Sequence, residues 1–360
     1  MTDRPLPLGD IIDMQIRQSG PMSVATYMGL CLSHPRAGYY TGGGDPLGAG
    51  GDFVTAPEIS QMFGELIGFF VVNLWQQLDQ PRSFTLLELG PGRGTLMQDA
   101  LRVAARAEGF LDAMHLQLYD SNPALRAQQQ HRLGVYNPSW ADEIDAVAED
   151  PLIVIANEFF DALPIRQFVR GEQGWHERQV GLRDGKRVFG LSPTPISTEA
   201  MPEEVRGAAI GEICEVSLAA ADVMQRLGQR IAAQRGAVLA IDYGYAPTQT
   251  GETLQAVRRH GFTDPLAEPG VADLSAHVDF AALARVATGL GLTAEPLAAQ
   301  RDFLAHLGIV ERATALARAN PERLDELGAA LRRLTDSAEM GTLFKAFCAH
   351  SGNLEPLGFS

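Results

Sequence analysis

The chain has 360 residues, of which 46% are hydrophobic and 20% are charged, and its formal net charge at pH 7 is -15. This much apolar material is enough for one large core or for a core domain with an elaborated insertion. An excess of acidic residues repels a phosphate backbone, and no basic stripe with interleaved aromatic residues is visible, so we expect no nucleic-acid partner. An acidic surface favours a cationic substrate instead.

Membrane insertion, a targeting segment and a metal site are also not expected. The longest apolar run, residues 66–74, is interrupted by Gly68 and Asn73 and is shorter than the ~20 residues of a membrane span. Residues 1–10 resemble neither a secretory signal nor a transit peptide, so we expect a cytoplasmic protein. The sequence does not determine the oligomeric state, and a homodimer is one option. The cysteines and histidines lack metal-ligand spacing.

The N-terminal part of the chain has a helical pattern and a glycine-rich interruption. Apolar spacing over residues 8–32 predicts two short helices, with a break at Gly20 and Pro21 and with Ser23 as the N-cap of the second helix. Residues 38–51 are rich in glycine, which is typical of a long loop and often of an active-site lid. Helix is predicted again from about residue 59 to about residue 78.

From residue 84, short apolar runs alternate with helical stretches, as in a parallel sheet with crossover helices. We predict strands at 85–89, 115–119, 152–156 and 237–241, and helices at 95–107, 123–133 and 215–235. Residues 167–191 alternate apolar and charged side chains, which predicts antiparallel strands. Helix dominates from residue 279, and a final strand pair is predicted at 342–349 and 354–359.

These elements predict an α/β fold with a mostly parallel, Rossmann-like sheet, N-terminal helices and an insertion. In chain order, we expect N-terminal helices with an active-site loop in 1–80, the sheet core in 81–250 with an antiparallel insertion at about 166–200, a mainly helical subdomain in 251–340, and strands that complete the sheet in 341–360.

A glycine-rich turn follows the first predicted strand in the sequence ELGPGRG. A strand that enters a helix through such a tight turn requires unusual backbone angles at Gly90 and Gly92, and the missing side chain at Gly94 allows close approach. Backbone amides around Pro91 then line a polar pocket. The acid Glu88, two residues before the first glycine, attracts a cation such as the sulfonium and amino group of S-adenosylmethionine (SAM), and it repels a pyrophosphate.

An acid also ends the second predicted strand. Asp120 is placed to accept hydrogen bonds from ribose hydroxyls, with Ser121 beside it, but dinucleotide folds use the same contact. Two alternatives therefore remain at this point: a structural glycine turn without a cofactor, and a site for NAD(P) or FAD.

The sequence NEFFDALP follows the strand at 152–156, where ligands bind in open α/β sheets. Asn157 is a candidate for both cofactor and substrate, Glu158 and Asp161 are candidates to hold a cation, and Phe159 or Phe160 to stack on it. The alternative is that both phenylalanines are core residues and that Asp161 caps the next helix.

Upstream, a polar set lies near a predicted helix start and is expected to close over the cofactor: Asp52, Glu58 and Gln61. Thr55, in the same segment, is a further candidate to bind the cofactor. Thr55 and Ser60 are alternatively simple helix caps. Asp242 and Tyr243, at the end of the strand at 237–241, are further candidates for a substrate pocket.

Several long segments together resemble the MidA family of bacterial and mitochondrial proteins. They are GDFVTAPEISQMFGELIG, LLELGPGRGTLMQDALR, NEFFDALPIRQF, IDYGY, ETLQAVRRHGFTDPLAEPGVADLSAHVDF and MGTLFKAF. The resemblance implies a class I methyltransferase core with a family-specific insertion and SAM as methyl donor. In the mitochondrial member it implies, as acceptor, an arginine of the large quinone-site subunit of complex I.

Carried over to this chain, the resemblance implies that Glu88, Gly90, Gly92 and Gly94 bind SAM and that NEFFDALP faces the transferred methyl. At the second strand the family has an acid followed by Ser-Pro, whereas this chain reads Asp-Ser-Asn-Pro from Asp120 and keeps the acid.

Our hypothesis is a protein arginine N-methyltransferase that aids complex I assembly. In it, Glu158 and either Asp161 or Glu58 orient a guanidinium, which stays protonated far above neutral pH. The alternatives are a small-molecule methyltransferase, a non-catalytic assembly factor that binds SAM, and an NAD(P)-linked oxidoreductase.

Overall fold

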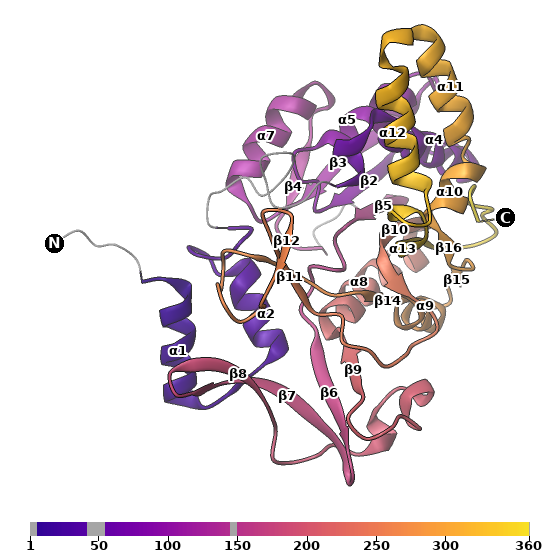
Figure 1. Ribbon diagram of the computed structural model, residues 1–360. Helices are drawn as coiled ribbons and strands as arrows, with labels where there is room; N and C mark the ends of the chain where they lie inside the picture. Colours follow the sequence, from indigo (N-terminus) through magenta and orange to yellow (C-terminus); the bar gives the residue numbers. More distant parts are fainter. Residues whose placement is uncertain (1–5, 42–54, 145–149, 360) are drawn as a thin grey trace. The chain divides into compact units, whose positions relative to one another are not determined.

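The structure is a computed structural model that describes residues 6–41, 55–144 and 150–359. Two compact units make up the chain, and each is built from three separate stretches (Figure 1). Unit 1 comprises Met1–Phe53, Asp161–Asp222 and Tyr245–Ala281, and unit 2 comprises Val54–Phe160, Val223–Gly244 and Ala282–Ser360. The chain therefore passes between the units several times. The sequence analysis, in contrast, predicted continuous segments with boundaries at residues 80, 250 and 340.

Unit 2 contains the main sheet. Its strands are β2 (Phe84–Leu89), β3 (Met114–Tyr119), β4 (Ser139–Ala141), β5 (Leu152–Asn157), β10 (Gly236–Tyr245), β15 (Thr293–Ala294), β16 (Ala298–Ala299) and β17 (Phe344–His350). Its helices are α3 (Ala56–Ile59), α4 (Gln61–Gln77), α5 (Thr95–Ala104), α6 (Phe110–Ala113), α7 (Pro123–Leu133), α10 (Gln300–His306), α11 (Ile309–Ala319), α12 (Leu324–Thr335) and α13 (Met340–Leu343), together with most of α8 (Leu218–Gln234) and α9 (Phe280–Gly289).

The strand order of this sheet is β15-β17-β10-β5-β2-β3-β4. The strands β4, β3, β2, β5 and β10 pair in parallel, and β17 runs antiparallel to both β10 and β15. Chain order reverses between β2 and β5, because β3 lies on one side of β2 and β5 on the other. A switch of this kind opens a crevice at the carboxyl ends of the two strands, where ligands bind in such folds.

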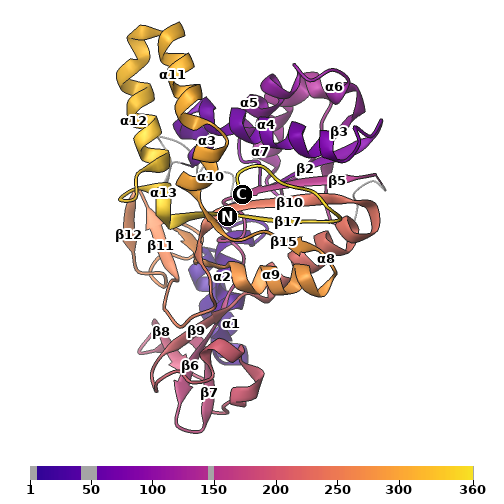
Figure 2. The same ribbon diagram turned by 90° about the vertical axis from the view of Figure 1, so that its right-hand side faces the viewer.

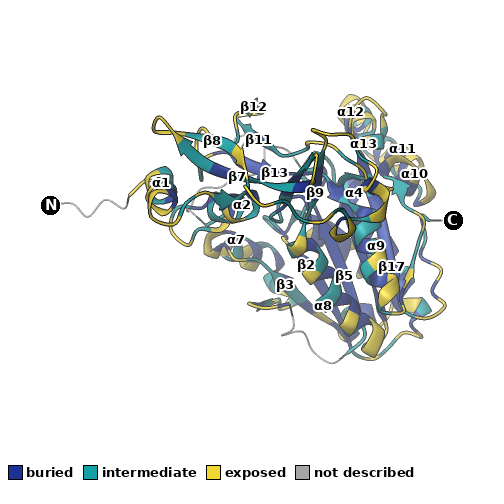
Figure 3. Cartoon of the chain, turned by 90° about the horizontal axis from the view of Figure 1, so that it is seen from below, coloured by how far each residue is buried: buried dark blue, intermediate teal, exposed yellow. Residues whose placement is uncertain are grey.

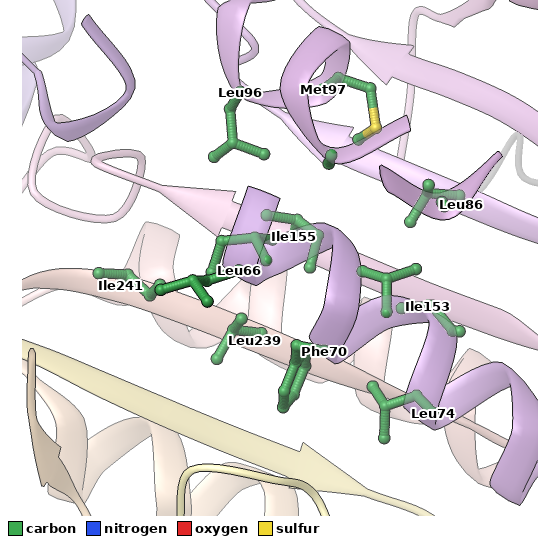
Figure 4. Packing of buried hydrophobic residues seen from close by; sticks show 14 of the residues in the cluster. Leu66, Phe70, Leu74, Leu86, Leu96, Met97, Ile153, Ile155, Leu239 and Ile241 are labelled. Carbon is green, nitrogen blue, oxygen red and sulfur yellow. The ribbon is translucent and has the colours of Figure 1, made fainter. Parts of the chain in front are cut away.

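Helices cover both faces of the sheet: Figure 2 shows α4 and α5 on one side and α8 and α9 on the other. Strands buried on two faces read as continuous apolar runs. This is true of β2 and β5, all of whose residues are buried and which Figure 3 shows in dark blue. On the α4 side, Leu66, Phe70 and Leu74 pack on Ile153 of β5 and Leu239 of β10 (Figure 4).

The close packing of α4 on α5 depends on two glycines of α4. A Cβ at Gly64 would lie 2.7 Å from Cβ of Asp99, and one at Gly68 would lie 2.3 Å from the carbonyl oxygen of Ala100. Both distances are too short for a real side chain, so only glycine allows this approach. The approach fixes α5, and with it the glycine-rich turn that precedes α5.

A second contact joins α4 to the hairpin of α11 and α12. Met62 of α4 packs with Leu316 of α11 and Leu327 of α12. Glu65 is almost fully buried in α4, and its carboxylate accepts hydrogen bonds from Arg312 at 2.6 and 2.8 Å and from Arg102 at 2.8 Å. These two guanidinium groups lower the pKa of Glu65 despite its burial. The carboxylate thus ties α11 and α5 to α4.

Unit 1 combines the N-terminal helices with two small sheets. Its elements include α1 (Leu8–Ser19), β1 (Met22–Ser23), α2 (Val24–Ser33), β6 (Arg166–Gly171), β7 (Gly174–Arg183), β8 (Lys186–Leu191), β9 (Ile213–Val216), β11 (Gln255–Arg258), β12 (Gly261–Thr263), β13 (Asp273–Ser275) and β14 (Val278–Asp279). One sheet has the order β1-β7-β6-β9 with β8 paired to β7, and the other has the order β12-β11-β13. All pairings within the two sheets are antiparallel.

Most predicted elements are confirmed. The two N-terminal helices are present, and Ser23 caps α2 by accepting a hydrogen bond from the amide of Thr26 at 3.0 Å. The four predicted parallel strands correspond to β2, β3, β5 and β10, and the antiparallel segment corresponds to β6, β7 and β8. The predicted glycine-rich lid at residues 38–51 falls mostly outside the described residues.

Two predictions about elements were wrong. Helix dominates from α9 onward, as predicted, while residues 255–275 add strands β11, β12 and β13, for which the sequence analysis made no prediction. The helix predicted from residue 215 begins at Leu218, because Ile213–Val216 pairs with β6 as strand β9. Residues 354–359 are not a strand: Pro356 lacks an N–H for a ladder, and Phe359 packs on Phe303 with ring centroids 5.2 Å apart.

Within the described ranges, no helix is long and apolar enough to cross a membrane. In the same ranges, no group of three or more His, Cys, Asp or Glu side chains is arranged to hold a metal ion.

Candidate functional site

The glycine-rich turn joins β2 to α5. Gly90, Gly92 and Gly94 have φ angles of 63°, 53° and 78°, which a residue with a Cβ rarely adopts. The amide of Gly90 donates to the carbonyl of Tyr119 at 2.9 Å, and that of Gly94 donates to the carbonyl of Pro91 at 2.7 Å. The expected backbone requirement for glycine at the three positions is therefore met.

Glu88 is the penultimate residue of β2, and its side chain is 3% exposed. No described group forms a hydrogen bond with its Oε2 atom. Burial, and to a smaller extent the charge of Asp120, raises the pKa of the carboxyl to about 8. A buried carboxyl without a partner is costly unless a ligand satisfies it, and a cation is the ligand that stabilises its charged form.

Asp120, directly after β3, is held by its surroundings. Its Oδ1 accepts from the amide of Asn122 at 2.8 Å, and its Oδ2 accepts from Nε2 of Gln129 at 2.7 Å. Burial raises the pKa of the carboxyl, and these two hydrogen bonds oppose the rise. The neighbouring Ser121 is exposed.

The end of β5 contributes Asn157 and Glu158. The Asn157 amide donates from Nδ2 to Oε1 of Glu158 at 3.0 Å, while its buried Oδ1 meets no hydrogen-bond partner in the described structure. Glu158 is half-buried and has a positive φ of 51°, which is uncommon for a residue with a side chain. A strained backbone angle at the end of a central strand is typical of functional sites.

Asp242 holds the backbone that follows Glu158. Its fully buried Oδ2 accepts hydrogen bonds from the amides of Phe159 at 3.1 Å and Phe160 at 3.0 Å. Phe159 then lies against the glycine turn, because a Cβ at Gly90 would be 3.2 Å from its ring. Phe160 is a buried core residue, as the structural alternative predicted.

The short helix α3 carries the upstream candidates. Glu58 accepts a hydrogen bond from the hydroxyl of Thr95 at 2.6 Å and forms an ion pair with Arg93 at 3.6 Å, so its carboxylate holds α3 on the glycine turn. The amide of Ala56 donates to Oε1 of Glu158 at 3.1 Å, which joins α3 to the end of β5 as well. Thr55 is the N-cap residue of α3, and its side chain makes no capping hydrogen bond.

The remaining candidates have other surroundings. Ser60 caps α4, and Gln61 donates to Glu65 at 3.2 Å. Tyr243 packs edge to face on Phe344. Asp161 belongs to unit 1, where its carbonyl accepts from the amide of Ala276 at 3.0 Å, and no helix follows for it to cap. Asp52 lies outside the described residues.

This arrangement suits a cationic ligand with hydroxyl groups. Two acceptor atoms without described partners, Oε2 of Glu88 and Oδ1 of Asn157, are at the carboxyl ends of the adjacent strands β2 and β5. They fit the ammonium and sulfonium of SAM, and Asp120 fits the ribose hydroxyls. The residues present therefore fit this cofactor, and a pyrophosphate would be repelled by Glu88.

Sequence reasoning missed Gln129, Arg93 and Thr95. Gln129 is a fully buried glutamine on α7 that donates to Asp120 and to the carbonyl of Gly92, both at 2.7 Å. Its position in the run Gln128 to Gln130 gave no signal, because only the fold distinguishes the buried glutamine from its neighbours.

Comparisons with known proteins agree with this chemistry. A family model described as a putative S-adenosyl-L-methionine-dependent methyltransferase matches residues 66–297. The mitochondrial protein arginine methyltransferase NDUFAF7 of Danio rerio is 36% identical over 92% of this chain and 84% of its own length. The Homo sapiens protein of the same name is 35% identical over 82% of this chain and 72% of its own length.

A solved structure gives the same assignment. It is a likely methyl transferase of the COG1565 superfamily from Burkholderia thailandensis, bound to S-adenosyl-homocysteine. It superposes with a TM-score of 0.85 at 28% identity and covers 98% of this chain and 97% of that chain. The fold and the family resemblance predicted from the sequence are thus confirmed, and a nicotinamide oxidoreductase is no longer a competing interpretation. The chain belongs to the MidA-like family of S-adenosyl-L-methionine-dependent methyltransferases.

Proposed function

We propose that this enzyme transfers the methyl group of SAM to an arginine side chain of a protein. The names of the curated relatives, at 36% and 35% identity, support this acceptor. The end of β5 gives the main structural support: Asn157 and Glu158 provide an amide oxygen and a carboxylate there, beside the glycine turn.

When bound, SAM supplies an electrophilic methyl group on a sulfonium. The protein has to bring a guanidinium nitrogen into line with that methyl and to exclude competing orientations. A guanidinium keeps its positive charge at neutral pH, so a carboxylate that accepts its N–H groups draws the charge away from the attacking nitrogen.

Glu158 is the residue that we assign to this task. Its carboxylate is fixed by the Ala56 amide at 3.1 Å and by Asn157 at 3.0 Å, both of which bind Oε1. Glu58 is a weaker candidate, because Thr95 and Arg93 already engage both of its oxygens. Asp161 stays a candidate from unit 1.

The test is methyl transfer from labelled SAM to arginine-containing peptides and protein, with the variant Glu158→Gln. We expect transfer to fall at least about a hundredfold, while the affinity for S-adenosylhomocysteine changes less than about threefold. Glu322→Gln, at an exposed glutamate of the same enzyme, is the matched control and should act like the wild type. Equal loss of transfer and of cofactor affinity would move Glu158 into the cofactor site.

The finer proposal concerns the acceptor protein. We infer from the family resemblance that the methylated arginine lies in the quinone-site subunit of respiratory complex I, and that methylation aids complex I assembly. Deletion of the gene should lower the amount of assembled complex I, and a Glu158→Gln copy should not restore it. An unchanged amount of complex I in the deletion strain would refute the inference.

The same measurements separate the two other candidate functions. A non-catalytic assembly factor would restore complex I with Glu158→Gln and would show no turnover. A small-molecule methyltransferase would turn over with metabolite extracts and leave arginine in every protein unmodified.

A further inference from the structure

Gln129 of α7 is buried at the centre of a hydrogen-bond chain that joins three parts of unit 2. Its Nε2 donates to the carbonyl of Gly92 in the glycine turn and to Oδ2 of Asp120 after β3, each at 2.7 Å. Its Oε1 accepts from the indole Nε1 of Trp140 in β4, also at 2.7 Å. The side chain is 0% exposed, so water does not replace any of these partners.

The indole N–H fixes which way the amide points. An indole nitrogen is only a donor, so the amide oxygen of Gln129 has to face Trp140. Both N–H groups of the amide then face acceptors, one on Gly92 and one on Asp120. With the amide reversed, its oxygen would face the Gly92 carbonyl and the Asp120 carboxylate, and its N–H groups would face the indole N–H.

The Gln129 amide thereby fixes the positions of two parts of the cofactor site relative to each other. The Gly92 carbonyl belongs to the turn whose glycines have positive φ angles, and the Asp120 carboxylate is the expected ribose acceptor. Asn122 binds the other oxygen of Asp120 at 2.8 Å, so the carboxylate has little freedom to rotate. A Cβ at Gly94 would also lie 3.7 Å from Cγ of Gln129, which shows how closely α7 packs on the turn.

We propose that Gln129 is a positioning residue for ribose recognition, oriented by Trp140, that holds the Asp120 carboxylate in register with the glycine-rich turn. The inference rests on the proposed use of this site for SAM. Gln129 does not need to touch the cofactor: it acts through Asp120 and through the carbonyl of Gly92.

The test compares calorimetric binding of S-adenosylhomocysteine with binding of its 2′-deoxyribose analogue. In the wild type, loss of the hydroxyl should weaken binding about tenfold or more, as expected for a hydrogen bond to a charged group. In Gln129→Met, the affinity for S-adenosylhomocysteine should fall about tenfold, and the ratio between the two ligands should fall to about twofold.

Two further variants make the result specific. Gln129→Glu keeps an oxygen for Trp140 but offers at most one donor, the O–H of a protonated carboxyl, to the two acceptors on Gly92 and Asp120, so the discrimination should fall as well. Gln130→Met, at the exposed neighbouring glutamine, should keep the wild-type ratio. Thermal unfolding of each ligand-free variant shows whether the fold is retained.

The outcomes separate this inference from the cofactor assignment. An unchanged ratio in Gln129→Met and Gln129→Glu, or equal weakening of both ligands, would overturn the role of Gln129 while leaving SAM as cofactor. A wild type that binds neither ligand would overturn the cofactor site and the inference together.

Discussion

At the residue scale, the buried carboxyl of Glu88 couples cofactor binding to protons. Its pKa of about 8 means that most of the ligand-free protein carries the proton at neutral pH. A bound ammonium or sulfonium favours the carboxylate, so binding should lower this pKa and release about one proton per ligand at about pH 7. Calorimetry of S-adenosylhomocysteine binding in phosphate and in Tris buffer measures the release, and the affinity should rise as the pH approaches 8.

Glu88→Gln is the control for this linkage. The variant should bind more weakly and release almost no proton, whatever the buffer. The pH dependence of stability has the opposite sign to that of an ion-paired acid. Because the pKa of Glu88 is raised in the folded protein, its contribution to the free energy of unfolding is fully present below the unfolded-state pKa of ~4.3. This contribution is lost as the pH rises toward 8. Wild-type protein should therefore lose stability over this range relative to Glu88→Gln. Equal proton release by both proteins would place the titrating group elsewhere.

At the scale of elements, the contact between α4 and α5 predicts opposite effects for two glycine substitutions. Gly68→Ala should lower the free energy of unfolding by about 1–3 kcal/mol, because its Cβ would lie 2.3 Å from the backbone oxygen of Ala100. Gly328→Ala, within α12, meets its nearest atom at 3.6 Å and should raise stability by up to about 1 kcal/mol through helix propensity. Denaturant unfolding measures both, and a neutral Gly68→Ala would mean that the helices separate at little cost.

The elements also show what the sequence could and could not predict. The turn at Gly90, Gly92 and Gly94 was predictable because its requirement is local: the backbone angles demand glycine whatever lies nearby. The contacts of Glu58 were not, because Thr95 is 37 positions away in the sequence and its proximity to α3 depends on the fold. Apolar spacing at 354–359 correctly indicated that this segment packs on the protein, but it did not distinguish a strand from an irregular segment. Phe359 packs on Phe303, and the segment does not pair as a strand.

At the scale of the whole molecule, each unit draws on three stretches of chain, so no boundary in the sequence marks either of them. The insertion predicted at about 166–200 was visible as an antiparallel pattern, but the association of residues 161–222 with the N-terminal helices was not, because the apolar faces of α1 and α2 do not specify a partner. Buried residues of these helices, such as Ile12 and Tyr27, share a core with Ile165 and Leu274. Such a core is a product of long-range packing alone.

The net negative charge of the whole chain predicts how binding of the acceptor depends on salt. With 44 acidic residues against 29 Lys and Arg, the protein should attract a basic acceptor protein over distances longer than a hydrogen bond. Raising NaCl from about 50 to about 500 mM shortens the screening length several-fold, so the KM for a basic peptide acceptor should rise while kcat stays nearly constant. The KM for SAM is the internal comparison, because SAM has a smaller net positive charge than a basic peptide and binds at the buried Glu88, so its KM should rise less. A peptide KM that does not respond to salt would show that recognition of the acceptor depends on contacts at the reacting arginine and not on the field of the molecule.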